Sequence, residues 1–298
     1  MPQPDDLTVS VPLALALAGE LDGMTLHLRV EDCAALLRVA EQLPWQNVHR
    51  VTLPSIEDFE SVQDYSRRAH WNLWWPERDM GRLLDLAPTL RRRTVTLWVA
   101  PDDPDLHNKL AVGESLSLQM AVPLADPDCI DLADLNSLVS YVLLTGATRT
   151  VHIEPLASMV NTAAGREEQT LWDVANESVR HNLFVDDAGQ VSVSARLAPT
   201  HHFGTLADLA DGSIKSSAAY QRLHGYTEGL FRSQSVCSTC RAYPLCGGWL
   251  RYADPEYDCE VWQLVINSLQ DAVGEREAAK ALTQRPVETA RERTPQRR

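Results

Sequence analysis

The sequence lacks the long apolar run that a membrane-spanning helix needs. Its apolar stretch, residues 11–18 (Val-Pro-Leu-Ala-Leu-Ala-Leu-Ala), is too short to cross a bilayer. Asp5 and Asp6 precede this stretch, whereas a secretory signal begins with basic residues. We therefore expect a cytoplasmic protein without membrane contact, in which residues 11–18 form a buried strand.

The chain is also short of positive charge. Its 298 residues carry a formal net charge of -14, and the isoelectric point is near 5.0. A general nucleic-acid binder needs a basic surface to neutralise phosphates, so this class is excluded. Residues 284–298 are the exception: five Arg against two Glu give 5 - 2 = +3, which leaves -17 for the rest. With Pro286 and Pro295, this segment is predicted to be a disordered tail.

Several catalytic signatures are missing as well. The sequence contains no Gly-rich phosphate loop, no Ser/His/Asp order of a hydrolase and no metalloprotease helix. It has no internal repeat. We assign no catalytic residue from the sequence.

Residues 1–181 alternate short β-type runs with helical patterns. Strands are predicted over 11–18, 48–53, 94–99, 115–122 and 150–154, and helices over 31–43, 57–70, 80–87, 131–144 and 167–180. This alternation predicts an α/β fold, with a mostly parallel sheet that is covered by helices and is either open or closed into a barrel. With 44% hydrophobic residues, the chain can bury a sizeable core.

The pattern changes at residue 182. Two β-type runs, 183–185 and 191–193, flank Asp186-Asp-Ala-Gly189 and predict a hairpin. We expect a small second domain over 182–262, and a C-terminal helix with the basic tail over 263–298. The last helical pattern covers 260–282 and predicts these inward side chains: Val261, Leu264, Val265, Leu269 and Ala272.

Cysteine is rare except in one row near the C-terminus. Four of the six cysteines lie there, as Cys237-x2-Cys240-x5-Cys246 followed by Cys259. Four thiolates at this spacing hold either tetrahedral zinc or an iron–sulfur cluster, and the residues alone leave both open. Cys33 and Cys129 stand apart, and we expect them to be partly buried thiols without a role.

The cysteine row belongs to a longer pattern. The segments are Phe184-Val-Asp-Asp-Ala-Gly-Gln-Val-Ser-Val-Ser194, Phe203-Gly-Thr-Leu206 and Cys237-Ser-Thr-Cys-Arg-Ala-Tyr-Pro-Leu-Cys-Gly-Gly248. In this order they resemble a SPASM domain, the C-terminal module of many radical SAM peptide-modifying enzymes. The resemblance covers about residues 182–262, and the part before it is similar to the family's partial barrel in layout only.

The resemblance implies one 4Fe-4S cluster. SPASM domains usually hold two auxiliary clusters, and the four cysteines of the row match the complete ligand set of the second. The first set is missing, because its Gly-x4-Cys motif reads Gly189-x4-Ser194, Leu250 stands at another ligand position and residues 174–180 contain no cysteine. We expect one cluster, or zinc in its place.

The catalytic motif of the family is absent. Radical SAM enzymes bind their catalytic cluster through Cys-x3-Cys-x2-Cys after the first strand, where this chain reads Gly19-Glu-Leu-Asp-Gly23. The family's Gly-Gly-Glu segment is replaced by Pro54-Ser-Ile-Glu57. Without three thiolates on an open iron, SAM is not cleaved. The resemblance therefore implies a degenerate, pseudo-radical-SAM protein that does not use SAM.

A scaffold that has lost its catalytic motif suggests a protein that acts with partners. We predict a non-SAM-cleaving partner or scaffold subunit in a ribosomal-peptide modification system, forming a heteromer with a precursor peptide, a catalytic maturase or both. A stand-alone iron–sulfur oxidoreductase or electron carrier, and a binding protein braced by zinc, stay open as alternatives.

Two interpretations are open for one group of three tryptophans, and two for the single Trp249. Trp71, Trp74 and Trp75 form either part of the core or a peptide-binding surface. Trp249 either shields the cluster from water or packs in the core.

Overall fold

The computed structural model describes residues 7–76, 80–123, 132–144, 156–166 and 168–283. Its sheet has nine strands in the order β6-β5-β4-β3-β2-β1-β7-β8-β9. They are β1 (Thr8–Pro12), β2 (Thr25–Arg29), β3 (Val48–Leu53), β4 (His70–Trp74), β5 (Val95–Trp98), β6 (Gln119–Ala121), β7 (Asn182–Val185), β8 (Gln190–Ser192) and β9 (Gly204–Thr205).

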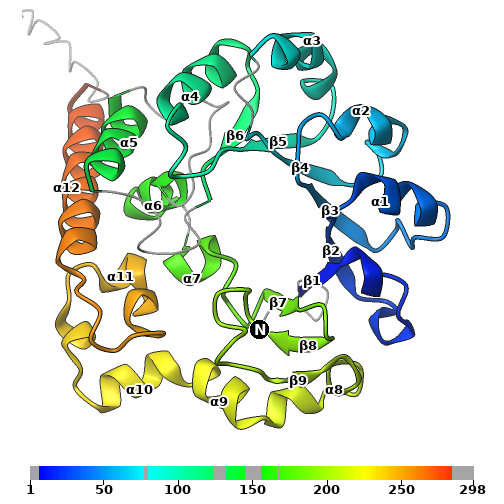
Figure 1. Ribbon diagram of the computed structural model, residues 1–298. Coiled ribbons are helices and arrows are strands. Elements are labelled where there is room, and N and C mark those ends of the chain that lie inside the picture. Colours follow the sequence, from blue (N-terminus) through cyan, green and yellow to red (C-terminus); the bar gives the residue numbers. More distant parts are fainter. Residues whose placement is uncertain (1–6, 77–79, 124–131, 145–155, 167, 284–298) are drawn as a thin grey trace, which may run out of the picture.

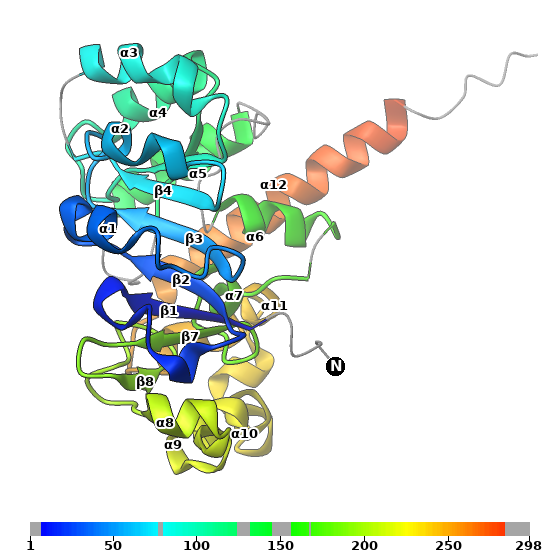
Figure 2. The same ribbon diagram turned by 90° about the vertical axis from the view of Figure 1, so that its right-hand side faces the viewer.

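The helices cover both sides of this sheet. They are α1 (Cys33–Val39), α2 (Phe59–Val62), α3 (Met80–Leu90), α4 (Leu106–Ser115), α5 (Leu132–Leu144), α6 (Leu156–Ala163), α7 (Leu171–Val174), α8 (Leu206–Ala210), α9 (Ala218–His224), α10 (Tyr226–Arg232), α11 (Tyr243–Cys246) and α12 (Glu260–Thr283). Figure 1 shows the sheet as a curved wall with α1, α2 and α3 outside it. Helices α6, α7 and α12 lie on the other side of the wall (Figure 2), and α12 packs against α5 and α6. No helix among the described residues has the length and apolarity to span a membrane.

The pairing of the strands confirms the predicted α/β class. Strands β1 to β6 pair in parallel with their neighbours, and β7 pairs in parallel with the other side of β1. Strands β8 and β9 are antiparallel. The hairpin between β7 and β8 forms where it was expected, with Gly189 at φ 76 and Asp186 Oδ1 accepting from the N–H of Gln190. The sheet is therefore continuous across residue 182, where a second domain was predicted to begin.

The strands alternate between apolar and polar side chains. The apolar set of β2 to β5 is buried: Leu26, Leu28, Val51, Leu53, Trp71, Leu73, Val95 and Leu97. The alternate positions carry a largely polar set: His27, Arg29, Arg50, Thr52, His70, Asn72 and Thr96. A parallel sheet that is covered on both faces is usually apolar on both. The polar face therefore marks a place where the sheet borders a cavity.

Several predicted elements of the first half are wrong. Residues 11–18 do not form one strand, because β1 ends at Pro12 and a 3-10 turn of Leu and Ala follows, residue types that favour helical turns. The helix predicted over 57–70 is replaced by the short α2, a 3-10 turn and the start of β4 at His70. The helix predicted over 167–180 is reduced to the four residues of α7.

Two further expectations also need correction. The strand predicted over 115–122 is the end of α4 followed by the short β6. In α12 the buried side includes Trp262 and Ile266, whereas Val261 and Leu264 are 37% and 58% exposed. The predicted inward positions Val265 and Leu269 are buried, so the prediction is confirmed for these two residues and wrong for Val261 and Leu264.

The clustered tryptophans belong mainly to the core. Trp71 and Trp75 are 0% and 1% exposed, and half-buried Trp74 packs edge-on against Trp98 with ring centroids 5.2 Å apart. The core alternative therefore holds for Trp71 and Trp75. The strand predicted over 150–154, and Cys129, lie outside the described residues.

Candidate functional site

The first two cysteines of the row sit on a capped 3-10 turn. Ser235 Oγ accepts from the N–H of Cys237 at 3.1 Å, and the N–H of Cys240 donates to the carbonyl oxygen of Cys237 at 3.2 Å. Both cysteines are half-buried. The turn fixes the backbone of the pair and leaves the pair accessible to a ligand from solution.

The third cysteine ends α11 and is enclosed by the backbone that follows it. Cys246 is 9% exposed, and Gly247 and Gly248 adopt left-handed conformations, with φ of 61 and 82. Burial raises the pKa of Cys246 to about 11, although hydrogen bonds from the backbone N–H groups of Leu250 and Gly248 lower it. N–H groups aimed at a sulfur favour its thiolate form, which is the form that binds metals.

The double glycine is required by packing as well as by the turn. A Cβ on Gly247 would lie 2.9 Å from Trp172 Cδ1, and one on Gly248 would lie 2.5 Å from Leu230 Cδ1. Trp172 Nε1 donates to the carbonyl oxygen of Gly247 at 3.0 Å, and Tyr226 Oη donates to that of Gly248 at 3.4 Å. Aromatic side chains therefore hold the backbone beside Cys246 in place.

The fourth cysteine lies directly before α12. Cys259 is 7% exposed, and Arg251 Nε donates to its Sγ at 3.4 Å. Burial raises the pKa of Cys259, and the guanidinium of Arg251 lowers it. Arg251 is a cation placed to balance a thiolate, and no sequence motif had marked it.

The four cysteines fit a metal in donor type. Negative charge on Cys237 raises the pKa of both Cys246 and Cys259, and charge on Cys240 also raises that of Cys259, so the sulfurs are within electrostatic reach of one another. Within the part of the chain that the structure describes, no three His, Cys, Asp or Glu side chains are arranged closely enough to hold an ion. A bound metal would have to displace thiol protons and draw the side chains together.

A buried polar network lies beside this row. Glu177 is 1% exposed and accepts four bonds: from Ser194 Oγ at 2.6 Å, from two Arg196 guanidinium nitrogens at 3.1 and 2.5 Å, and from Trp249 Nε1 at 2.5 Å. Ser194 is the residue that the resemblance aligns with a lost cysteine ligand, and Leu250, at another such position, is buried. A carboxylate and a guanidinium thus lie beside Ser194 and Trp249. Trp249 is 2% exposed, which places it in the core.

The polar face of the sheet borders a cavity of about 680 Å³. Its walls include Arg50, His70, Asn72 and Thr96. Arg50 Nε is buried and has no hydrogen-bond partner among the described residues, and burial lowers the pKa of this side chain. A half-buried guanidinium that lines a cavity is suited to bind an anionic group.

Two histidines near Arg50, His27 and His70, have lowered pKa values. His27 Nε2 is 2.8 Å from Thr52 Oγ1, and His70 Nε2 is 2.9 Å from Thr96 Oγ1. Burial, followed by the charge of Arg50, lowers the pKa of His27 to about 3 and that of His70 to about 4. The positive charge on this wall therefore comes from arginine. Sequence reasoning missed these residues, although the polar alternation in residues 48–53 was a visible signal.

The comparison with solved structures first defines a class of fold. That class is the α/β fold with a mostly parallel sheet described above. In particular, a solved structure of native anSMEcpe with bound AdoMet is similar, with a TM-score of 0.60 and 10% sequence identity, over 93% of this chain and 99% of that one. At this identity the likeness shows the fold alone. No protein-family profile and no curated protein matches the chain.

Proposed function

We propose that this protein is a non-SAM-cleaving partner or scaffold subunit of a ribosomal-peptide modification system. One observation carries the proposal: the fold is similar to that of a protein solved with bound AdoMet, yet the sequence has no Cys-x3-Cys-x2-Cys run. Three such thiolates are needed to hold a cluster with an open iron. A chain that keeps the barrel but lacks them is suited to bind a peptide or another protein.

The barrel cavity supports peptide binding. Arg50 lines a space of about 680 Å³, and Asn72 and Thr96 add further polar groups. A peptide carboxylate, from an acidic side chain or from the chain end, would accept from Arg50. The cavity would thereby fix the position of a precursor peptide.

The cysteine row supports one metal centre. We assign an auxiliary-type 4Fe-4S cluster to Cys237, Cys240, Cys246 and Cys259, with zinc as the alternative. When bound, a cluster supplies electron transfer, and zinc supplies a structural brace. Arg251 and the N–H groups of Gly248 and Leu250 would balance the negative charge of the thiolates.

Exposed apolar side chains near the cysteines support a protein partner. Phe231 and Val236 precede Cys237 and are 49% and 65% exposed, and Leu264, on the first turns of α12 after Cys259, is 58% exposed. Large apolar side chains at the surface are typical of interaction sites. We therefore infer that the face around the cysteine row contacts a maturase in a heteromer.

The half-buried position of Cys237 and Cys240 favours a second candidate function, a stand-alone iron–sulfur electron carrier. Electrons exchange readily with a cluster that lies near the surface, so such a carrier would need no lasting complex.

Anaerobic purification and co-purification test both candidates. The full chain is expressed together with the short peptide and the maturase that the proposal expects to be encoded beside it, and is analysed for iron, sulfide and zinc. The proposal expects about four irons per chain and a stable complex. A chain that contains the cluster but stays monomeric beside those proteins would support the carrier, and a colourless zinc protein would exclude electron transfer.

A further inference from the structure

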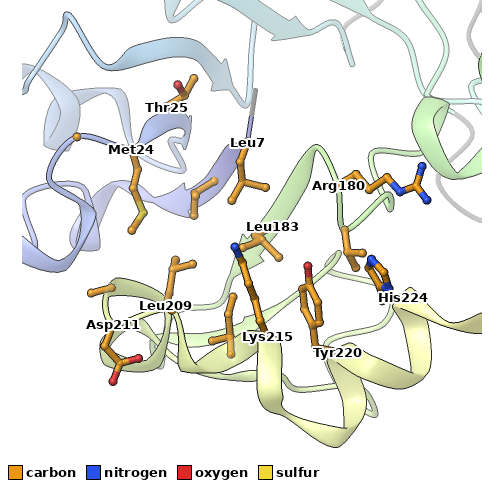
Figure 3. A pocket seen from close by; sticks show the side chains of 16 residues that line it. Leu7, Met24, Thr25, Arg180, Leu183, Leu209, Asp211, Lys215, Tyr220 and His224 are labelled. Atoms are coloured by element: carbon orange, nitrogen blue, oxygen red, sulfur yellow. The ribbon is translucent and has the colours of Figure 1, made fainter. Parts of the chain in front are cut away.

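A second cavity, of about 880 Å³, lies where the N-terminal ends of β1, β2 and β7 face α8 and α9. Figure 3 shows it between Leu7 and Leu183 on one side and Lys215 and Tyr220 on the other. It includes no cysteine of the row and not Arg50. The candidate site described above does not account for it.

The floor of this cavity is apolar. Its described apolar residues are Leu7, Val9, Met24, Val179, Leu183, Leu209, Ala210 and Ile214. Val9, Leu183 and Ile214 are at most 3% exposed, so the floor is part of the core and is preformed. Such a floor binds a hydrocarbon chain through the hydrophobic effect.

The charged and polar side chains that line the cavity include Arg180, Asp211, Lys215 and Tyr220. In Figure 3 the ammonium of Lys215 and the hydroxyl of Tyr220 both point toward Leu183, whereas the carboxylate of Asp211 points away from the cavity. Among the described residues, the Lys215 ammonium and the Tyr220 hydroxyl make no ion pair and no hydrogen bond. His224 also lines the cavity and stacks on the Tyr220 ring with centroids 6.0 Å apart.

We propose that this cavity binds a small amphiphilic carboxylate, with an apolar body and one anionic head. The apolar body would lie on the floor around Leu183, and the carboxylate would accept from Lys215 Nζ and Tyr220 Oη. A cation and a hydroxyl together match one carboxylate. A volume of about 880 Å³ is within the range of small-molecule sites. In a chain with net charge -14, an open cation above an apolar floor favours an anionic ligand over a cationic one.

Titration calorimetry of the full chain tests the proposal, with decanoate below its micelle concentration as the probe. Decylammonium has the same chain with the opposite charge, and acetate has the head without the chain. We expect one decanoate per protein, binding of decylammonium at least about ten-fold weaker, which is about 1.4 kcal/mol, and no measurable acetate binding. Equal binding of decanoate and decylammonium, or no decanoate binding, would overturn the proposal.

Substitutions locate the site. Lys215 is exposed, so Lys215→Met should keep the fold while weakening decanoate about ten-fold, and Lys215→Arg should retain binding. Ala210 is exposed at the cavity edge, and Ala210→Trp should abolish binding by filling the space. Arg92→Gln, an exposed position outside the cavity, is the matched control. Undiminished binding in both Lys215→Met and Ala210→Trp would place decanoate elsewhere and contradict the proposal.

Discussion

Trp249 donates its indole N–H to Glu177 Oε2 at 2.5 Å, across 72 positions of sequence. Trp249 directly follows the double glycine that encloses Cys246, and the Arg196 guanidinium lies 4.9 Å from the centroid of its ring. Because Arg196 also pairs with Glu177, one carboxylate connects the cysteine loop to the segment after β8. The position of the cysteine row relative to the barrel therefore depends on a buried polar network.

Replacing the carboxylate of this network should destabilise the fold strongly. In Glu177→Gln the Arg196 cation would lose its anion in a place where the two side chains are 17% and 2% exposed. Breaking a buried pair costs about 3 kcal/mol or more in unfolding free energy. Urea unfolding would measure the loss. The control is Glu228→Gln, which breaks an i,i+4 pair with Arg232 whose side chains are 66% and 75% exposed, and which should change stability by less than about 0.5 kcal/mol. Equal losses in the two variants would contradict the role of the network.

The double glycine gives a second prediction. Gly248→Ala places a Cβ 2.5 Å from Leu230 Cδ1 on a residue with φ of 82. The left-handed strain and the clash together should cost about 2 kcal/mol or more. Gly229→Ala is the control, because a Cβ on this α10 residue meets nothing within 4 Å. Alanine there should stabilise the protein by about 0.5–1 kcal/mol, owing to its higher helix propensity. Thermal unfolding would measure both variants. A loss in Gly248→Ala alone would indicate local strain, and a similar loss in both would contradict this explanation.

The neutral histidines of the barrel predict how stability depends on pH. The pKa of His27 falls from 6.5 in the unfolded chain to about 3 in the folded one. Below pH 6.5 the unfolded chain therefore takes up a proton that the folded chain refuses, and stability falls as the pH falls. For His27 the loss between pH 7 and pH 5 is about 1–2 kcal/mol. His27→Gln keeps a partner for Thr52 and should remove this part of the loss in urea unfolding at the two pH values. An unchanged difference between pH 7 and pH 5 would mean that His27 is protonated in the folded protein.

The sequence was sufficient for the elements whose pattern is local. Residues 48–53 alternate clearly and form β3, and Asp186 with Gly189 supplies the turn chemistry of the hairpin. Strand β4 was missed because Trp71-Asn-Leu-Trp74 follows a helix-like pattern without a break. The inward face of α12 depends on its contacts with α5 and α6, which no local pattern contains.

In the candidate site, too, local patterns could be predicted from the sequence and contacts between distant segments could not. The spacing of the cysteines could be read directly from the sequence. Glu177 and Arg196 could not, since neither lies in a motif and their contacts join distant segments. Arg50 was hidden for another reason, because one charged residue within a strand is equally consistent with a solvent-exposed edge. Its half-buried position beside the cavity follows only from the curvature of the sheet and from what covers it.

Arg50 should depress the pKa of its histidine neighbour by its charge. The pKa of His70 is about 4, lowered by burial and then by Arg50. Arg50→Met removes the charge while keeping much of the volume, so the pKa of His70 should rise by about half a unit or more and stay below 6.5. Proton NMR titration of the histidine ring signals would measure it. Arg38→Met, at an exposed position of α1, is the control and should leave His70 unchanged. An unaltered His70 in Arg50→Met would show that the two side chains do not interact.

Removing one cysteine of the row tests the metal assignment. Cys240→Ala leaves three thiols for the proposed centre, and we expect the metal content of the anaerobically purified chain to fall below about a tenth of the wild-type value. Solubility and thermal stability should fall with it, because the remaining thiols then lack their ligand. Cys33→Ala is the control: this cysteine is buried, but it lies outside the row and should leave the metal content unchanged. After chelation, wild type and Cys240→Ala should melt at the same temperature, which separates loss of metal from a packing defect. Full metal content in Cys240→Ala would remove Cys240 from the ligand set.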